Sequence, residues 1–462
     1  MRRAECAIVT DPSSERPGYP PFPAVGGFGE PSRRCCGLDC VSGRSALMRA
    51  AHSLALACSL AAAAHGSEEF FDRLSDSLVF SSNDGRFRAR VSGTLDLEAY
   101  RVQAPAPGLI YTASESLFNP RLTLFLDAQA GDRVYVFAQA RADRGFDPAD
   151  RHLRGRLDEY AVRIAPWDGA NFNIQVGKFA TVVGSWVPRH GSWENPFITA
   201  PLAYEHVTGI WDSVAARTRG TLLGWAHVGT GSTAAEEYAD KHLRSPIIWG
   251  PAYSSGVAMF AESGRLTGAL EVKNAAPSIR PDGWDATRRS FEHPTVNARL
   301  TWQPNVMWRL GMSASSGPYL RPSATPTLAP GHGLGDYRQV LIAQEIAFAW
   351  HHWQVWVEVF QARFEIPVVG DADVVSGYAE VKYRFTPMFA GSVRWNFQTP
   401  GSIPTANGGS AKWGRETQRI DFAPTWRFSP NSQLKLQLSL QHEPGAPRKD
   451  SRMLAAQFTV RF

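Results

Sequence analysis

The final segment of the chain, Ser451–Phe462, alternates apolar and polar side chains and ends on an aromatic residue. In a strand, successive side chains point to opposite faces, so every second residue shares a face. One face of this segment is therefore apolar and the other is polar. Strands of about 9–11 residues with this pattern are the units of a transmembrane β-barrel. The apolar face consists of Leu454, Ala456, Phe458, Val460 and Phe462.

The same period of two recurs along most of the chain and predicts about eighteen strands. The pair at 209–218 and 220–229 is the least regular, so sixteen strands remain an alternative. The expected strands are 87–103, 119–130, 133–142, 156–166, 171–179, 209–218, 220–229, 255–263, 265–274, 294–303, 306–315, 338–349, 352–363, 375–385, 388–397, 417–428, 433–442 and 451–462.

The connections between these strands alternate strictly between short and long. Tight turns are expected at 131–132, 263–264, 304–305, 350–351, 386–387 and 429–432. Long polar segments are expected at 102–118, 143–155, 180–208, 230–254, 275–293, 316–337, 364–374, 398–416 and 443–450. Outer-membrane barrels have short periplasmic turns and long external loops, whereas a soluble sandwich or propeller does not sort its loops in this way. The predicted fold is an all-β, transmembrane antiparallel β-barrel of about 16–18 strands.

Aromatic residues flank the expected tight turns. A band of such residues at strand ends is typical of the aromatic girdle at a membrane interface, although core aromatics near turns are the alternative. The residues concerned are Trp302, Trp308, Trp350, Trp353, Phe385, Phe389 and Phe428.

The front of the chain differs in composition from the rest. All five cysteines lie before residue 66, and a cysteine-free body suits an exported protein without disulfides. Residues 48–66 have a basic start, a short apolar core and small residues, which predicts a signal peptide. Residues 1–47 are interpreted as a disordered extension from an incorrect upstream start, and 67–86 as a short periplasmic leader that either forms an amphipathic helix or stays loose. The barrel is expected over 87–462. Neither a zinc knuckle at Cys35, Cys36 and Cys40 nor a lipid anchor at Cys58 has the spacing that such a site needs.

The closing strand ending in Phe462 resembles that of Gram-negative outer-membrane proteins. The resemblance implies an outer-membrane location, contact with outer-membrane lipids and recognition of this strand by the barrel assembly machinery.

The stretch Gly177-Lys178-Phe179, followed by Gly184, resembles the segment before the third loop of phosphate-selective-type and related porins. The resemblance implies that residues 180–208 fold into the barrel as a constriction loop, and that the protein forms a homotrimer. Phosphate is not carried over as the solute, because the motif is short and eighteen strands would depart from the sixteen of that family.

Candidate constriction residues follow from the loop and from strand parity. Trp186, Arg189, His190, Trp193 and Glu194 lie in the expected loop, where the tryptophans either line the narrowest point or pin the loop to the wall. Parity directs further basic residues inward, and an excess of them favours anions. The alternative is that they pair with Glu159, Glu358, Glu380 and Asp421 across neighbouring strands. The basic residues are Arg299, Arg309, Lys382, Arg384, Arg394, Arg419, Arg427 and Lys435.

No catalytic motif is recognisable, and we expect no enzyme activity, cofactor, metal or nucleic-acid partner. The pair His351-His352 suits a turn or girdle position better than a metal site. The sequence thus predicts a passive diffusion porin for small hydrophilic or anionic solutes. The alternatives are an outer-membrane enzyme or adhesin, and a soluble glycan-binding β protein.

Overall fold

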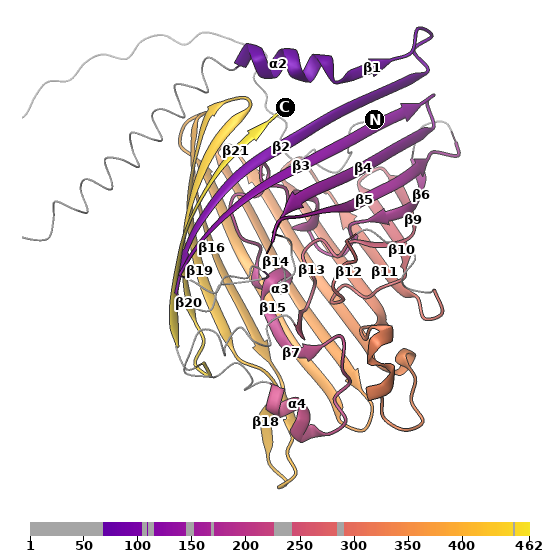
Figure 1. Cartoon of the computed structure of the whole chain (residues 1–462), viewed down its shortest axis with the longest axis vertical. Coiled ribbons are helices and arrows are strands. Elements are labelled where there is room, and N and C mark those ends of the chain that lie inside the picture. Colours follow the sequence, from indigo (N-terminus) through magenta and orange to yellow (C-terminus); the bar gives the residue numbers. More distant parts are fainter. Residues whose placement is uncertain are drawn as a thin grey trace, which may run out of the picture.

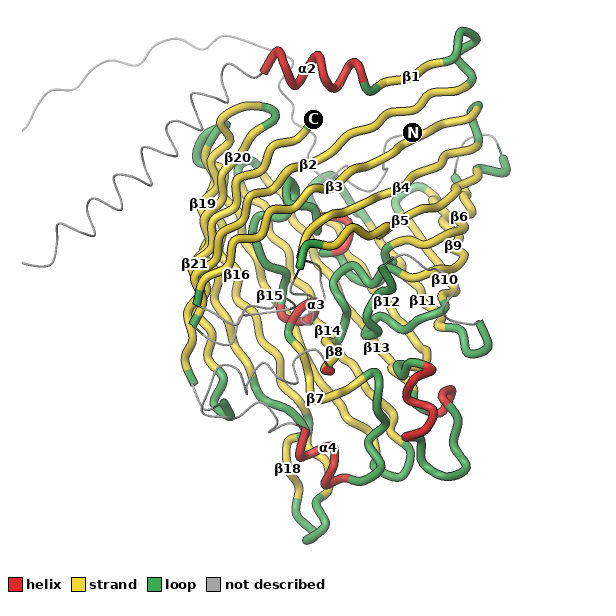
Figure 2. Tube along the Cα trace, in the orientation of Figure 1, coloured by secondary structure: helices red, strands yellow, loops and turns green. Residues whose placement is uncertain are grey.

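The computed structural model describes residues 68–103, 109, 115–144, 152–167, 171–225, 243–283, 291–446 and 449–462. Sixteen antiparallel strands within these ranges form a closed barrel in which each strand pairs with its neighbours along the chain (Figures 1 and 2). The barrel strands are β2 (Phe87–Val102), β3 (Ser116–Ala130), β4 (Val134–Asp143), β5 (Arg154–Ile164), β6 (Phe172–Phe179), β9 (Ser254–Ser263), β10 (Leu266–Lys273), β11 (Thr295–Trp302), β12 (Trp308–Pro318), β13 (Arg338–Trp350), β14 (Trp353–Ile366), β15 (Gly370–Arg384), β16 (Phe389–Pro400), β19 (Thr417–Ser429), β20 (Ser432–His442) and β21 (Asp450–Arg461).

The last strand closes the barrel against the first. β21 pairs with β2 from Thr94↔Arg461 to Val102↔Met453. The next pair, Gly93 and Phe462, exchanges two backbone hydrogen bonds of 3.0 Å. A Cβ on Gly93 would lie 2.5 Å from the Phe462 ring, so the glycine leaves room for this ring. Beyond that point, the short strand β1 (Val79–Ser81) pairs with β2 and covers its edge.

Two predicted barrel strands are wrong. Where 209–218 was expected to span, β7 (Val207–Trp211) pairs instead with β8 (Arg244–Pro246) in a separate two-stranded sheet. Where 220–229 was expected, helix α4 (Arg219–Trp225) forms, and residues 226–229 lie outside the described residues. The barrel therefore has sixteen strands, and the loop that starts at residue 180 continues to residue 253. We name its described residues, 180–225 and 243–253, L3.

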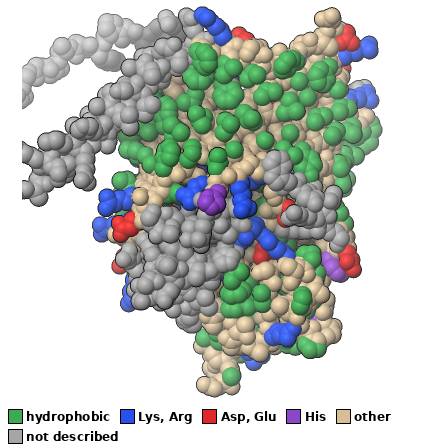
Figure 3. Space-filling view, in the orientation of Figure 1, with side chains coloured by type: hydrophobic (Ala, Val, Ile, Leu, Met, Phe, Trp, Pro, Cys, Tyr) green, Lys and Arg blue, Asp and Glu red, His purple; other side chains and the backbone are tan. Residues whose placement is uncertain are grey.

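The outer face of the barrel is apolar and the inner face is polar. On β11, Val296 and Leu300 are 45% and 56% exposed, whereas Asn297 and Arg299 between them are 1% and 8% exposed. Figure 3 shows a continuous band of hydrophobic side chains on the wall that faces the viewer. An exposed apolar band around a closed barrel is the arrangement that spans a lipid bilayer, because closure satisfies every strand edge.

A belt of aromatic rings lies on the side of the tight turns, as expected. Ring contacts run from Trp353 to Tyr383, to Phe385, to Phe389 and on to Trp426, with centroids 4.5–5.3 Å apart. These rings follow the turns between β13 and β14 and between β15 and β16. Their position at the strand ends is that of an interfacial girdle.

The segment before the barrel contains helix α2 (Glu68–Ser77), which matches the helical option for the expected leader. The expected extension at 1–47 and the expected signal peptide at 48–66 lie outside the described residues. Within the described ranges, no helix is long and apolar enough to cross a membrane.

Candidate channel constriction

L3 leaves the wall at the end of β6 and packs inside the barrel. Its described part contains the 3-10 helix η1 (Val187–Arg189), helix α3 (Leu202–Glu205), β7, α4 and β8. The expected inward fold of residues 180–208 is thus present, within a longer loop. Gly184 has a φ of +89°, and a Cβ there would overlap the Tyr204 hydroxyl. Glycine is therefore needed where the loop turns inward.

The motif before L3 has a structural role. A Cβ on Gly177, whose φ is +145°, would overlap the Tyr160 carbonyl and lie 2.6 Å from the Ala161 Cα. The Lys178 amine donates to the backbone carbonyls of Leu157 and Asp282, and Phe179 is 2% exposed. Gly177 and Lys178 therefore hold β6 against β5 and against the connection after β10.

Arg189 is the residue of η1 that contacts the wall. Its Nη1 lies 2.5 Å from the Glu380 carboxylate, and its Nη2 donates to the Tyr378 hydroxyl at 3.1 Å. The guanidinium also lies 4.4 Å from the centre of the Trp356 ring. Burial by itself lowers the pKa of Arg189, but Glu380 and Tyr378 together outweigh burial, and the pKa rises above its usual range. Arg189 is a buried cation that pins L3 to β15.

The two neighbouring candidates pack inside L3. The Trp186 ring lies 4.8 Å from the Tyr204 ring, and its side chain is 4% exposed. His190 contacts the Val187 carbonyl through Nδ1 at 2.6 Å and the Tyr253 hydroxyl through Nε2 at 2.9 Å. These contacts agree with the pinning alternative for Trp186.

Asp421 is the centre of a second attachment of L3. Its carboxylate lies 2.9 Å from Arg394 Nη2 and 3.1 Å from Arg419 Nε, and all three side chains are at most 1% exposed. Arg419 reaches Glu205 of α3 at 2.6 Å. Both guanidiniums also donate to the Ala200 carbonyl. Arg394 and Arg419 therefore follow the pairing alternative and hold L3 by charge-assisted hydrogen bonds.

A third attachment joins L3 to β20. The Lys435 amine donates to the carbonyls of Ser192 and Asn195. Gln437 accepts hydrogen bonds from the backbone N–H groups of Ile198 and Thr199 at 2.7 and 3.1 Å. Residues 192–199 thus follow the wall closely.

Trp193 and Glu194 lie next to this attachment. The Trp193 ring is 5.2 Å from the Arg427 guanidinium carbon and 4.2 Å from that of Arg461, which are cation–π distances. Glu194 is exposed, unlike its neighbours in L3.

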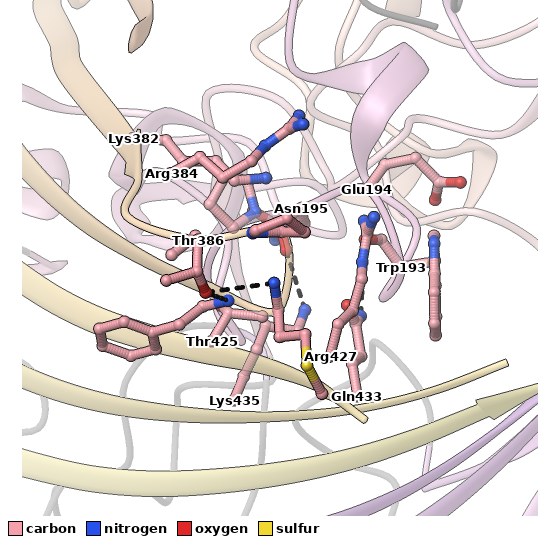
Figure 4. A pocket seen from close by; sticks show the side chains of 15 residues that line it. Trp193, Glu194, Asn195, Lys382, Arg384, Thr386, Thr425, Arg427, Gln433 and Lys435 are labelled. Carbon is pink, nitrogen blue, oxygen red and sulfur yellow. Dashed lines mark hydrogen bonds between the residues drawn. The ribbon is translucent and has the colours of Figure 1, made fainter. Parts of the chain in front are cut away.

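The remaining strand candidates face inward, as parity predicts. Arg299 pairs with Glu345 at 2.7 Å. Arg309 is half-buried on β12. Lys382 and Arg384 line a recess on the turn side of L3, together with Trp193 and Glu194 (Figure 4). The structure therefore brings together two kinds of candidate, those that anchor L3 and those that border this recess. Whether they line the narrowest point of a channel stays a prediction.

A charged ladder on β2–β5 was missed by the sequence reasoning. Arg121 lies 2.8 Å from Glu98 and 3.2 Å from Asp143. Arg156 contacts both Asp143 and Asp158 at 2.5 and 2.8 Å. In the sequence, these residues lie at the inward-facing positions of their strands, and that parity is the signal that indicates them. The sequence prediction included only Glu159 from the strand at 156–166. The ladder makes this wall a row of alternating charges.

On the loop side, the other part of L3 is held by apolar packing. Ile210, Leu222, Ile247 and Ile248 are at most 1% exposed and form one core with inward-facing wall residues such as Phe360. L3 is thus a packed element rather than a loose segment. Among the described residues, no group of three or more His, Cys, Asp or Glu side chains is placed to hold a metal ion.

Solved structures that share this fold include several outer-membrane proteins. OmpF of Salmonella typhi, solved in complex with daunomycin, matches with a TM-score of 0.50 and 11% identity, covering 83% of this chain and 100% of that chain. The outer membrane channel DcaP of Acinetobacter baumannii matches with 0.50 and 10%, covering 83% and 99%. A loop L8 deletion mutant of OmpT of Vibrio cholerae matches with 0.50 and 6%, covering 82% and 100%. No protein-family model and no curated protein matches the sequence.

The fold and the apolar band define a Gram-negative outer-membrane β-barrel with sixteen strands and a porin-like architecture. At these identities, the likeness concerns the fold alone.

Proposed function

We propose that this protein is a passive diffusion channel for small hydrophilic solutes. The observation that carries the proposal is a closed sixteen-stranded barrel with a polar inner face, into which L3 is fixed by buried ion pairs. Barrels of about 16–18 strands are wide enough for an aqueous channel. A loop attached inside such a barrel narrows the channel without closing the strand wall.

We propose further that the channel prefers anions. Arg189, Arg394 and Arg419 are paired with carboxylates and contribute little net charge. The support comes from the recess, where Lys382 and Arg384 have no carboxylate within ion-pair distance among the described residues. A cation cluster between low-dielectric walls raises the local concentration of anions.

Planar-bilayer recording of the purified protein tests both statements. Stepwise currents are expected. In a salt gradient, the reversal potential should have the sign that indicates preferential permeation of anions. Absence of steps would reject the channel, and a cation-selective potential would reject the preference. The double variant Lys382→Gln/Arg384→Gln should shift the potential toward neutrality. Arg363→Gln, an exposed residue on the loop side of β14, is the control.

The assembly partners are proposals as well. The resemblance at Gly177–Phe179 supports a relationship to phosphate-selective-type porins and a homotrimer, and the paired Phe462 supports recognition by the barrel assembly machinery. Crosslinking in native membranes would show a trimer, and a Phe462→Ala variant should assemble less completely than wild type.

An enzyme or adhesin on the same barrel is the alternative of another class. We propose that the protein is not an enzyme, because the histidines of L3 take part in packing: His190 contacts the Tyr253 hydroxyl and His206 contacts the Thr417 hydroxyl. Steady hydrolysis of phospholipid or ester substrates by purified protein, absent from a His190→Gln/His206→Gln variant, would overturn this statement.

A further inference from the structure

One row of the turn-side recess has two small side chains between two cations. Across four neighbouring strands, Arg384 pairs with Ala390, Ala390 with Thr425, and Thr425 with Lys435. Arg427 lies two residues from Thr425 on β19, on the turn side. Long basic side chains thus border a floor made of Ala390 and Thr425.

Apart from Lys435, which holds L3, the cations of the lining come from two strands. Strands in a sheet lie about 4.8 Å apart, so the backbones of β15 and β19 are about 10 Å apart across β16. Lys382 and Arg384 stand on β15, and Arg427 stands on β19 next to Trp193. Figure 4 shows Lys382, Arg384 and Arg427 among the side chains that surround the recess. An anion with two charged ends can contact a cation of β15 with one end and Arg427 with the other.

The rest of the lining is suited to the apolar segment that would join the two charged ends of such an anion. Pro387, Met388 and Phe389 come from the turn between β15 and β16 and give the recess an apolar border. The Glu194 carboxylate is the acidic group of the lining, and in Figure 4 it points away from Arg384. The carbonyl groups of Ser192 and Asn195 are occupied by Lys435, so they do not compete for the cations of β15.

We propose that this recess binds a small elongated dianion, in which a short hydrocarbon segment joins two carboxylate or sulfonate groups. Lys382 and Arg384 bind one end, Arg427 binds the other, and Ala390 and Thr425 leave space for the segment between them. The inference rests on the proposed channel for its biological role, since the recess lies in the lumen. It adds to the proposed function the class of solute that binds on the turn side of the channel.

Isothermal titration calorimetry of the detergent-solubilised protein tests the site without requiring conduction. Glutarate and propane-1,3-disulfonate are the elongated dianions, butyrate is the singly charged control, and inorganic phosphate is the compact control. Both dianions should bind with one site per chain and at least about tenfold more tightly than butyrate or phosphate, because the second charged end adds a charge-assisted interaction.

Variants locate the binding. Arg384→Gln and Lys382→Gln should each weaken glutarate binding about tenfold, while Arg384→Lys should retain most of it. Arg88→Gln is the matched control, because Arg88 is an exposed basic residue on the turn side of β2, outside the recess. Heat-modifiable migration in detergent verifies that each variant keeps a closed barrel.

Three results would overturn the proposal: no binding of either dianion, phosphate binding as tight as glutarate, or equal weakening by Arg88→Gln and Arg384→Gln. Binding without bilayer currents would reject the channel and keep the site. Currents without binding would reject the site alone.

Discussion

The guanidinium of Arg189 in L3 lies 2.5 Å from the carboxylate of Glu380 on β15, and the carboxylate is fully buried. These residues are 191 positions apart, so their pairing fixes the loop across the lumen. Replacing Arg189 by Gln leaves a buried carboxylate, for which Arg394 at 3.7 Å is the remaining ion-pair partner. Breaking a buried pair from one side typically costs about 3–5 kcal/mol.

The first prediction is that Arg189→Gln loosens L3. We expect larger and noisier single-channel conductance in planar bilayers, together with a lower denaturant midpoint. The double variant Arg189→Gln/Glu380→Gln removes both charges and should recover part of the lost stability. Wild-type conductance in the single variant would contradict a constricting role for Arg189.

The second prediction concerns Gly177. An alanine there would overlap the backbone of β5 and would require a strained φ, which costs about 1–3 kcal/mol before any displacement of the strand. We expect Gly177→Ala to reduce the fraction of protein that migrates as a closed barrel without boiling. Gly268→Ala on β10 is the control, because a Cβ there meets no atom within 4 Å. Equal yields for both variants would refute the close approach of β5 and β6.

The third prediction concerns Asp421, which lies between two guanidiniums. Asp421→Asn removes the shared charge and should lower the free energy of unfolding by about 3–5 kcal/mol, since Arg394 and Arg419 stay buried. Asp373→Asn is the control, because its pair with Arg363 is about half exposed and is worth under about 1 kcal/mol. Denaturant unfolding in detergent measures both, and a similar loss in the two variants would contradict the buried network.

Sequence periodicity predicts the barrel because side-chain direction in a strand is a local property. The inward direction of Arg299 and Arg394 followed from it. The same property misled at 207–211, where a short strand pairs with β8 in a small separate sheet and not with the wall. No local sequence feature distinguishes a barrel strand from a strand of this small sheet, because the difference depends on whether the pairing partner is a wall strand or β8.

The ion-pair partners of the candidate residues could not be predicted from the sequence for a related reason. Arg394 meets the Thr199 carbonyl across 195 positions, and parity gives no distance between such groups. The alternative that the cations pair with acids was open, and the structure adopts it for Arg299, Arg394 and Arg419. The partner Glu205 was not considered, because it lies in a helix of L3.

The last prediction is that alkaline pH destabilises the packed L3. Burial raises the pKa of Tyr204 well above its usual value of 10.0, and the nearby Glu358 carboxylate raises it further. Burial likewise raises the pKa of Tyr253 and Tyr319, which also lie in loops. A group whose pKa is higher in the folded state contributes stability below its unfolded pKa and loses it as the pH rises. Ionisation of these tyrosines should therefore lower the free energy of unfolding only above about pH 10, by about 1.4 kcal/mol per pH unit for each tyrosine.

Denaturant unfolding between pH 8 and 12, with tyrosinate absorbance recorded in parallel, measures this dependence. Tyr204→Phe should be less stable at pH 8, because Glu358 loses a hydrogen bond of 2.9 Å, a loss of about 1–3 kcal/mol. Above pH 10, the free energy of unfolding of this variant should fall less steeply than that of wild type. The difference in slope should be about 1.4 kcal/mol per pH unit, the contribution of one tyrosine. Parallel curves for the two proteins would show that Tyr204 ionises without unfolding and would contradict its burial within L3.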